Sequence, residues 1–276
     1  MRTQMQRIGI ATIGQAPRDD VVPAMRGYLP DGLEIVERGA LDGLSHAETR
    51  PYWAAPGEVG IVTKLRDGSS VLLSHAKILP LMQAAVDGLV REDGANLVVI
   101  LCGANWSELR SERLIVNPGT LFPAVIGSLA AGRRLGIIKP DAGQIEKERA
   151  RYAALGVDAT VTAASPYAGP ARLDLARDAG EQLRDAGCDL AWMTCIGMDA
   201  PMRDIVAEVT GVPVILAHAL LARVVTELLG TMGEVNLRHG VPLRIPAGPA
   251  GTAEPSDSVE HERIFAEAWL SRRDPG

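Results

Sequence analysis

Two stretches of the chain, GANLVVILC at residues 94–102 and GCDLAWMTC at residues 187–195, share one pattern. In each, a glycine stands eight residues before a cysteine, a leucine follows that glycine by three positions, and an apolar run leads to the thiol. Short apolar runs of this kind are typical of strands buried on both faces of a parallel sheet. Cys102 and Cys195 are therefore predicted to end equivalent buried strands, at the edge where α/β sheets present chemistry to solvent.

The segments around these stretches predict two halves of similar design. Residues 7–13 form a short apolar run that ends at Gly14, and residues 134–138 form a second run of the same kind. Apolar residues at helical spacing occupy residues 76–89 and 219–229. Strands that alternate with helices imply parallel sheets with right-handed crossovers, so an α/β fold is predicted.

The first half carries an insertion. From the glycine of its opening strand to its cysteine, the first half spans 93 residues and the second spans 59, so the first is longer by 34. Apolar runs at residues 61–65 and 71–73 flank an Asp-Gly pair, which is a hairpin signal. A β-hairpin insertion is therefore predicted near residues 58–75.

Composition and charge exclude several classes of protein. Of the 276 residues, 47% are hydrophobic and 22% charged, which is ordinary for a globular protein. The net charge of −6 argues against nucleic acid or an anionic membrane as the main partner. No apolar stretch has the length of a membrane span, and the first residues lack the apolar centre of a signal peptide. With only three cysteines, reduced thiols in a cytoplasmic protein are expected.

Two thiols at equivalent places suit proton transfer without a cofactor. A thiolate is a competent base, so one can remove the proton α to a carboxylate or carbonyl while a second thiol returns a proton to the opposite face. A lone strand-end cysteine is more often a buried structural residue, and Cys188 is interpreted in this way. The repeated placement favours the catalytic interpretation for Cys102 and Cys195.

The residues that follow the two thiols can bind an anion. Gly103, Ile196 and Gly197 lie where backbone N–H groups can converge on a negative charge. Asn105 is a candidate to hydrogen-bond a substrate carboxylate or amine, and a loop-capping role is the alternative.

A third candidate segment follows the first predicted strand. Gly14 and Gln15 form a turn whose backbone donors can hold an anion, and Arg18 can clamp a carboxylate bidentately. The alternative for Arg18 is an ion pair with Asp19 or Asp20 at the surface.

Several familiar sites are missing from the sequence. No G-x-G-x-x-G motif follows the first strand and no P-loop lysine motif occurs, so neither a dinucleotide nor an ATP site is indicated. There is no C-x-x-C motif, no paired histidine cluster and no G-x-S-x-G elbow. We therefore expect no cofactor and no metal. His75 and His218 are the histidines expected nearest a cleft, with core or capping roles as the alternative.

Two of these segments carry a resemblance to a known family. Residues 12–18, TIGQAPR, resemble the start of AroM-like proteins, a branch of the aspartate/glutamate/hydantoin racemase superfamily. Residues 194–198, TCIGM, are similar to the second-cysteine motif of hydantoin racemases, in which a glycine and a methionine also follow the thiol. The resemblance extends over roughly residues 7–230.

The resemblance implies two pseudo-symmetric, Rossmann-like αβα subdomains with parallel sheets and the active site in the cleft between them. Residues 1–230 would form this racemase-like domain, divided into about 1–132 plus part of the C-terminal helix and about 133–215, with residues 231–276 as a C-terminal extension. It also implies two catalytic cysteines at the strand-end positions, no cofactor, and assembly as a homodimer or higher homo-oligomer.

The predicted function is that of a cofactor-independent racemase or epimerase acting on a small carboxylated or carbonyl compound. Cys102 and Cys195 are the predicted acid and base. The predicted substrate-binding residues are Gly14, Gln15, Arg18, Gly103, Asn105, Ile196 and Gly197. Two alternatives stay open: a cofactor-free decarboxylase or isomerase, in which one thiol protonates a carbanion, and a non-catalytic protein that binds a small acid.

Overall fold

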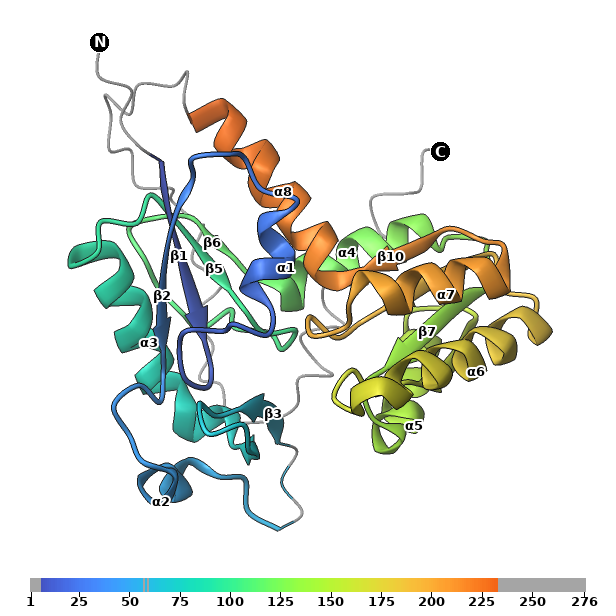
Figure 1. Ribbon diagram of the computed structural model, residues 1–276, viewed down its shortest axis with the longest axis horizontal. Coiled ribbons are helices and arrows are strands. Elements are labelled where there is room, and N and C mark those ends of the chain that lie inside the picture. The colour runs from blue at the N-terminus through green and yellow to red at the C-terminus, as the bar shows by residue number, and fades with distance from the viewer. Residues whose placement is uncertain (1–5, 57, 59, 233–276) are drawn as a thin grey trace, which may run out of the picture. The chain divides into compact units, whose positions relative to one another are not determined.

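The chain forms two compact units, each an α/β structure (Figure 1). The computed structural model describes residues 6–56, 58 and 60–232. Most of the predicted C-terminal extension, from residue 233 onward, lies outside these described residues.

The two units are interleaved along the chain. The first contains the described residues up to Val125, the short segment Thr194–Asp199, and residues 216–232. The second contains Ile126–Met193 and Ala200–Ile215. The segment that carries Cys195 therefore belongs to the first unit, although the strand that leads into it belongs to the second.

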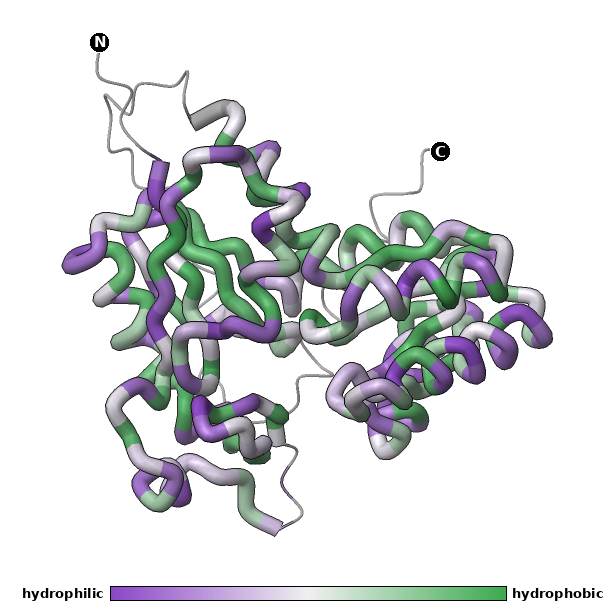
Figure 2. Tube along the Cα trace, in the orientation of Figure 1, coloured by the Kyte–Doolittle hydropathy of each residue, from purple (hydrophilic) through white to green (hydrophobic). Residues whose placement is uncertain are grey.

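The first unit is built on a four-stranded parallel sheet in the order β2-β1-β5-β6. Its strands are β1 (Arg7–Thr12), β2 (Glu34–Gly39), β5 (Leu97–Ile100) and β6 (Ile115–Val116). All four residues of β5 are buried, as its uninterrupted apolar sequence predicts. Figure 2 shows the same concentration of hydrophobic residues in the inner strands of the sheet.

Helix α3 (His75–Arg91) packs against β1, β2 and β5. Its apolar residues recur every three or four positions, and Ile78, Met82, Val86 and Leu89 are fully buried. A Cβ atom on Gly9 of β1 would lie 3.0 Å from Leu89, so the glycine allows the helix to approach the strand closely. The remaining helices that lie in or begin in this unit are α1 (Val22–Arg26), α2 (His46–Thr49), η1 (Arg50–Tyr52), α4 (Pro118–Leu129) and α8 (Ala217–Met232).

A separate two-stranded antiparallel hairpin interrupts the first unit. It consists of β3 (Ile61–Lys64) and β4 (Ser70–Leu73). The turn contains Gly68 at φ +87°, a left-handed conformation that glycine adopts without strain. Asp67 accepts a hydrogen bond from the backbone N–H of Ser69 at 2.8 Å. The Asp-Gly pair in the sequence is thus the chemical reason for the turn.

The second unit has a four-stranded sheet in the order β10-β9-β7-β8. Its strands are β7 (Leu135–Lys139), β8 (Ala159–Ala163), β9 (Leu190–Met193) and β10 (Val214–Leu216). Its helices are η2 (Ala142–Gln144), α5 (Ile145–Ala154), η3 (Gly169–Ala171), α6 (Arg172–Asp185) and α7 (Ala200–Thr210). Gly136 of β7 has the packing role of Gly9, since a Cβ there would lie 2.7 Å from Leu183 of α6.

The two sheets have the same topology. Taken from the other edge, the second sheet is ordered β8-β7-β9-β10, which matches β2-β1-β5-β6 strand for strand. The registers agree as well: Ile8 pairs with Leu97 in the first sheet, and Leu135 pairs with Leu190 in the second. The repeated glycine-to-cysteine pattern therefore corresponds to equivalent strands, β5 and β9. The predicted α/β fold with two parallel-sheet subdomains is confirmed.

Candidate active site

Cys102 lies just beyond the carboxyl end of β5, where a polar loop begins. Its side chain is buried, and its sulfur accepts a hydrogen bond from the backbone N–H of Ala104 at 3.4 Å. Burial raises the pKa of the Cys102 thiol above its ordinary value. The Ala104 N–H, the side chain of Trp106 and the positive charge of Arg18 oppose that rise. Since burial outweighs them, Cys102 rests as a protonated thiol at neutral pH.

Cys195 follows β9 after a single residue and is half-buried. Its carbonyl accepts a hydrogen bond from the N–H of Met198 at 3.1 Å, which closes a turn directly after the thiol. Charge on Cys195 contributes to the raised pKa of Cys102. The two sulfurs are therefore close enough for one to influence the protonation of the other.

Gln15 and Gly14 form the turn after β1, and their surroundings are crowded. The Gln15 carboxamide donates to the carbonyls of Leu41 and Leu44 at 3.1 and 2.7 Å and accepts from the N–H of Arg66 at 2.8 Å. A Cβ on Gly14 would lie 2.5 Å from Thr63 Oγ1. Gln15 thus ties three loops together. Direct binding of substrate by these two residues stays a prediction.

Arg18 is buried and forms a fork with Asp20. Its Nε and Nη2 atoms bond the two Asp20 carboxylate oxygens at 2.8 and 2.9 Å, and Nη1 lies 3.2 Å from Thr12 Oγ1. Burial alone would raise the pKa of Asp20, but the hydrogen bond and charge of Arg18 outweigh it and lower that pKa. Of the two acidic neighbours predicted for Arg18, Asp20 is the one that it binds. Because the charge of Arg18 also acts on Cys102, this ion pair lies near the thiol.

Asn105 is exposed, and its side-chain oxygen is a hub of hydrogen bonds. It accepts from the N–H and hydroxyl of Ser107 at 3.1 and 2.5 Å and from Asn117 Nδ2 at 3.1 Å. These bonds fix the loop after Cys102 to the segment that enters α4. Among the described residues no acceptor is bonded to Asn105 Nδ2, so the amide can still donate to a ligand. The substrate-binding role of Asn105 stays a prediction.

The three remaining candidate residues lie beside the thiols. Gly103 is exposed, and no atom lies within 4 Å of the place where its Cβ would be. Ile196 is buried, and its carbonyl lies 3.2 Å from Nδ1 of His218. Gly197 is half-buried. Every predicted site residue thus belongs to the first unit, where Cys102, Cys195 and Arg18 interact electrostatically.

Trp106 belongs to the site and was missed by sequence reasoning. Its indole is 1% exposed, lowers the pKa of Cys102, and stacks on His75 with ring centroids 4.4 Å apart. The sequence could have indicated Trp106 through its position four residues after Cys102. An aromatic side chain with a polar N–H is well suited to a buried loop beside a sulfur.

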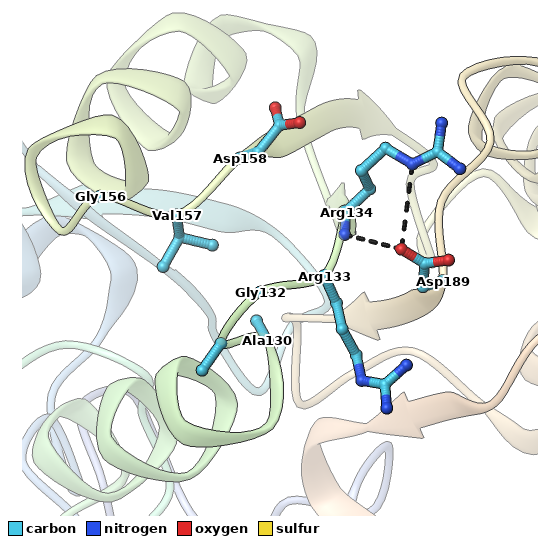
Figure 3. Close-up of a pocket in the computed structure, with 9 residues that line it drawn as sticks. Ala130, Gly132, Arg133, Arg134, Gly156, Val157, Asp158 and Asp189 are labelled. Atoms are coloured by element: carbon cyan, nitrogen blue, oxygen red, sulfur yellow. Dashed lines mark hydrogen bonds and ion pairs between the residues drawn. The ribbon is translucent and has the colours of Figure 1, made fainter.

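A pocket of about 340 Å³ lies elsewhere, in the second unit (Figure 3). It is lined by residues 130–134, 156–158 and Asp189. Arg134, Asp158 and Asp189 immediately precede β7, β8 and β9, so the pocket lies at the amino ends of these strands. The N–H and Nε of Arg134 lie 2.8 and 3.9 Å from Asp189 Oδ2. None of the predicted site residues lines this pocket.

The described residues contain neither a candidate metal centre nor a membrane-spanning helix. No group of three or more histidine, cysteine, aspartate or glutamate side chains within that part of the chain is arranged to hold a metal ion. Over the same residues, no helix combines the length and the apolar character needed to cross a membrane.

The architecture is similar to that of solved racemases. Allantoin racemase from Klebsiella pneumoniae superposes with a TM-score of 0.53 at 14% identity, covering 82% of this chain and 89% of that one. Glutamate racemase from Francisella tularensis subsp. tularensis SCHU S4, solved in complex with D-glutamate, gives a TM-score of 0.50 at 14% identity, with 85% of each chain covered. None of the curated proteins compared with the chain matches it. The chain therefore shares its fold with these two solved racemases.

Within that fold class the family is specific. The family model described as AroM protein matches residues 8–229, which is most of the 276-residue chain. The chain belongs to the AroM protein family, as the TIGQAPR segment after its first strand predicted.

Proposed function

We propose that this AroM protein is a cofactor-independent racemase or epimerase in which Cys102 and Cys195 exchange protons with a small carboxylated or carbonyl substrate. One observation carries the proposal. Both thiols belong to the first unit and follow the topologically equivalent strands β5 and β9. Negative charge on Cys195 raises the pKa of Cys102. Two acid/base groups with this relationship are what a two-base proton transfer requires.

The proton and electron balance of the step is simple. Cys195, as a thiolate, takes the proton from the carbon next to the substrate carboxylate or carbonyl. The electron pair of the broken C–H bond moves onto that group, which becomes enolate-like. Cys102 then gives its proton to the opposite face of the carbon, and the electron pair returns. Turnover leaves Cys195 as a thiol and Cys102 as a thiolate, which is the starting state for the reverse direction.

The surrounding residues are suited to an anionic substrate. The amides after the thiols, at Gly103, Ile196 and Gly197, would face developing negative charge, and Arg18 supplies a positive charge near Cys102. We include Gly14, Gln15 and Asn105 in the binding region as proposed contacts. The solved glutamate racemase, which holds D-glutamate, supports a small acid as the substrate class. We also propose that the protein works in the cytoplasm as a homo-oligomer.

An asymmetry between the thiols favours a second candidate. Cys102 is buried and protonated, whereas Cys195 is half-buried. A decarboxylase or isomerase needs one proton donor beside a carbanion, and Cys102 alone fits that task. In a decarboxylase of this kind, the bond between the α carbon and the carboxylate would break, carbon dioxide would leave, and Cys102 would protonate the carbanion that keeps the electron pair.

The test is α-proton exchange in D2O, screened over small chiral acids with the wild-type protein. With a substrate in hand, Cys102→Ser and Cys195→Ser are compared. The racemase proposal predicts that each variant loses racemisation, while exchange on one face can persist. A decarboxylase would lose turnover only with Cys102→Ser. Undiminished turnover in both variants would refute thiol catalysis, and binding of an acid without exchange would identify a non-catalytic binding protein.

A further inference from the structure

Among the described residues, the buried indole N–H of Trp106 meets no acceptor in ordinary hydrogen-bond geometry, although its side chain lies close enough to the Cys102 sulfur to lower the pKa of that thiol. The indole is 1% exposed, and its Nε1 atom is one of few buried side-chain nitrogen atoms in the described residues that donate to no acceptor. Buried donors are nearly always satisfied, because an unpaired one is unfavourable in a medium without water. Because this unpaired N–H lies beside a proposed catalytic thiol, we expect it to form a hydrogen bond during the reaction.

The indole is held firmly in this position. It stacks on His75, the first residue of α3, with an interplanar angle of 29°. Nε2 of His75 lies 3.0 Å from the carbonyl of Asn105, the residue before Trp106. Because a carbonyl can only accept, Nε2 carries the proton and donates. On its other side the loop rests on α4, where a Cβ on Gly119 would lie 2.3 Å from the Ala104 carbonyl oxygen.

We propose that Trp106 is a positioning residue for Cys102, whose indole N–H donates a hydrogen bond to the sulfur when Cys102 becomes a thiolate. The consequence for catalysis rests on the proposed function, in which Cys102 must give up its proton and later regain one. His75 of α3 stacks on the indole and fixes its orientation. Helix α3 therefore helps to position the N–H that donates to the thiolate.

Ionisation changes how strongly the Cys102 sulfur accepts a hydrogen bond. A neutral thiol is a weak acceptor, so it leaves the indole N–H unpaired, whereas a thiolate is a strong acceptor. Among the described residues, the Cys102 sulfur accepts one other hydrogen bond, from the Ala104 N–H at 3.4 Å. A buried thiolate with a single long hydrogen bond would be poorly stabilised. A second donor that pairs only with the thiolate selectively favours the ionised form.

Other ionisable groups also change the pKa of Cys102, and their effects have to be distinguished from that of Trp106. The charge of Arg18 lowers the pKa of the thiol, and that of Cys195 raises it. His75 stacks on the indole. None of these groups is altered by Trp106→Phe, which keeps an aromatic ring in the stack and removes only the N–H.

The first test measures the pH dependence of Cys102 alkylation in the full-length protein. Cys102 is the one cysteine in the tryptic fragment spanning residues 92–110, so mass spectrometry reports on it separately from Cys188 and Cys195. We expect the apparent pKa to rise by about one pH unit in Trp106→Phe, which is about tenfold less thiolate at a fixed pH. Phe122→Leu, which alters another buried aromatic ring, should leave the profile unchanged. Superimposable wild-type and Trp106→Phe profiles would overturn the proposal.

A second measurement does not require the tryptophan variant to fold. The chain has four tryptophans, and their indole ¹H–¹⁵N signals can be followed by NMR during a pH titration. We expect one indole proton to shift downfield as Cys102 ionises, and the shift to vanish in Cys102→Ser. If no indole signal depends on Cys102, the proposal is wrong.

Neither measurement uses substrate, so the two proposals can fail independently. Unchanged turnover in Cys102→Ser would refute the proposed function and leave the indole–thiolate bond intact. An unchanged alkylation profile in Trp106→Phe would refute the positioning role and leave two-thiol catalysis standing.

Discussion

Cys195 influences the protonation of Cys102, although the two cysteines follow strands of different sheets. The relationship arises because the chain leaves the second unit at Met193 and the segment Thr194–Asp199 packs as part of the first. Cys195 therefore follows a strand of the second sheet but belongs to the unit that contains Cys102 and Arg18.

Removing the positive charge of Arg18 should make Cys102 harder to ionise. That charge lowers the pKa of the thiol, so Arg18→Met should raise it further and slow alkylation of Cys102 at a fixed pH. Arg18→Lys retains the charge and should behave closer to wild type. The measurement is peptide-resolved alkylation as a function of pH, and equal profiles for the Met and Lys variants would argue against an electrostatic effect.

Asp20→Asn should destabilise the protein near neutral pH. The folded pKa of Asp20 lies below its unfolded value of about 4, so the charged form stabilises the folded state above that value. This contribution disappears as pH falls through the folded pKa. Urea unfolding should show a lower free energy of unfolding for the variant at pH 7, with the gap closing in strong acid. A gap that stays constant with pH would mean that the Arg18 ion pair is not its source.

Glu37→Gln should have the opposite sign. Burial raises the pKa of Glu37, and the charges of Asp19 and Asp20 add to the effect. A carboxyl whose pKa is higher in the folded state than in the unfolded state destabilises the folded state once it is charged. The loss of stability develops as the pH rises through the unfolded pKa and then the folded pKa. The glutamine oxygen can still accept the N–H of Arg18, which bonds Glu37 at 2.8 Å. The variant should therefore be more stable than wild type at pH 7 and equal to it below about pH 4.

Gly119→Ala should disturb the loop that follows Cys102. The new Cβ would lie 2.3 Å from the Ala104 carbonyl oxygen and 2.4 Å from the Asn105 Cα, and backbone atoms cannot rotate aside. We expect a loss of roughly 1–3 kcal/mol in the free energy of unfolding and altered alkylation of Cys102.

Gly127→Ala is the matched control on the same helix. No atom lies within 4 Å of its Cβ position, so stability should rise by about 0.5–1 kcal/mol through helix propensity. If both alanine variants had the same effect, the close approach of Gly119 to the loop would not be the determining contact.

Much of the fold is predictable from local sequence. The apolar runs before Cys102 and Cys195 indicate two buried strands, and the structure has them as β5 and β9 in equivalent registers. The hairpin follows from the Asp-Gly pair, because glycine supplies the left-handed turn. These features depend on residues that are neighbours along the chain, so their spacing carries the information.

The partners of the site side chains are not predictable in this way. The sequence left Arg18 with two acidic neighbours, of which the fold pairs it with Asp20. It named no partner for Gln15, whose bonds come from the folded loops around Leu41, Leu44 and Arg66. Hydrogen bonds and burial of this kind depend on segments that are distant in sequence and adjacent in space.

The sequence by itself determined that this protein has two thiols at the ends of equivalent buried strands, and it indicated the AroM family through one short segment. Only the tertiary structure decided that Cys195 joins the unit of Cys102, that Asp20 holds Arg18, and that the Trp106 indole lies beside the sulfur. The physical reason is the distance along the chain over which each interaction acts. Strand burial and turns are set by near neighbours, whereas the protonation of a buried thiol is set by whatever the fold brings around it.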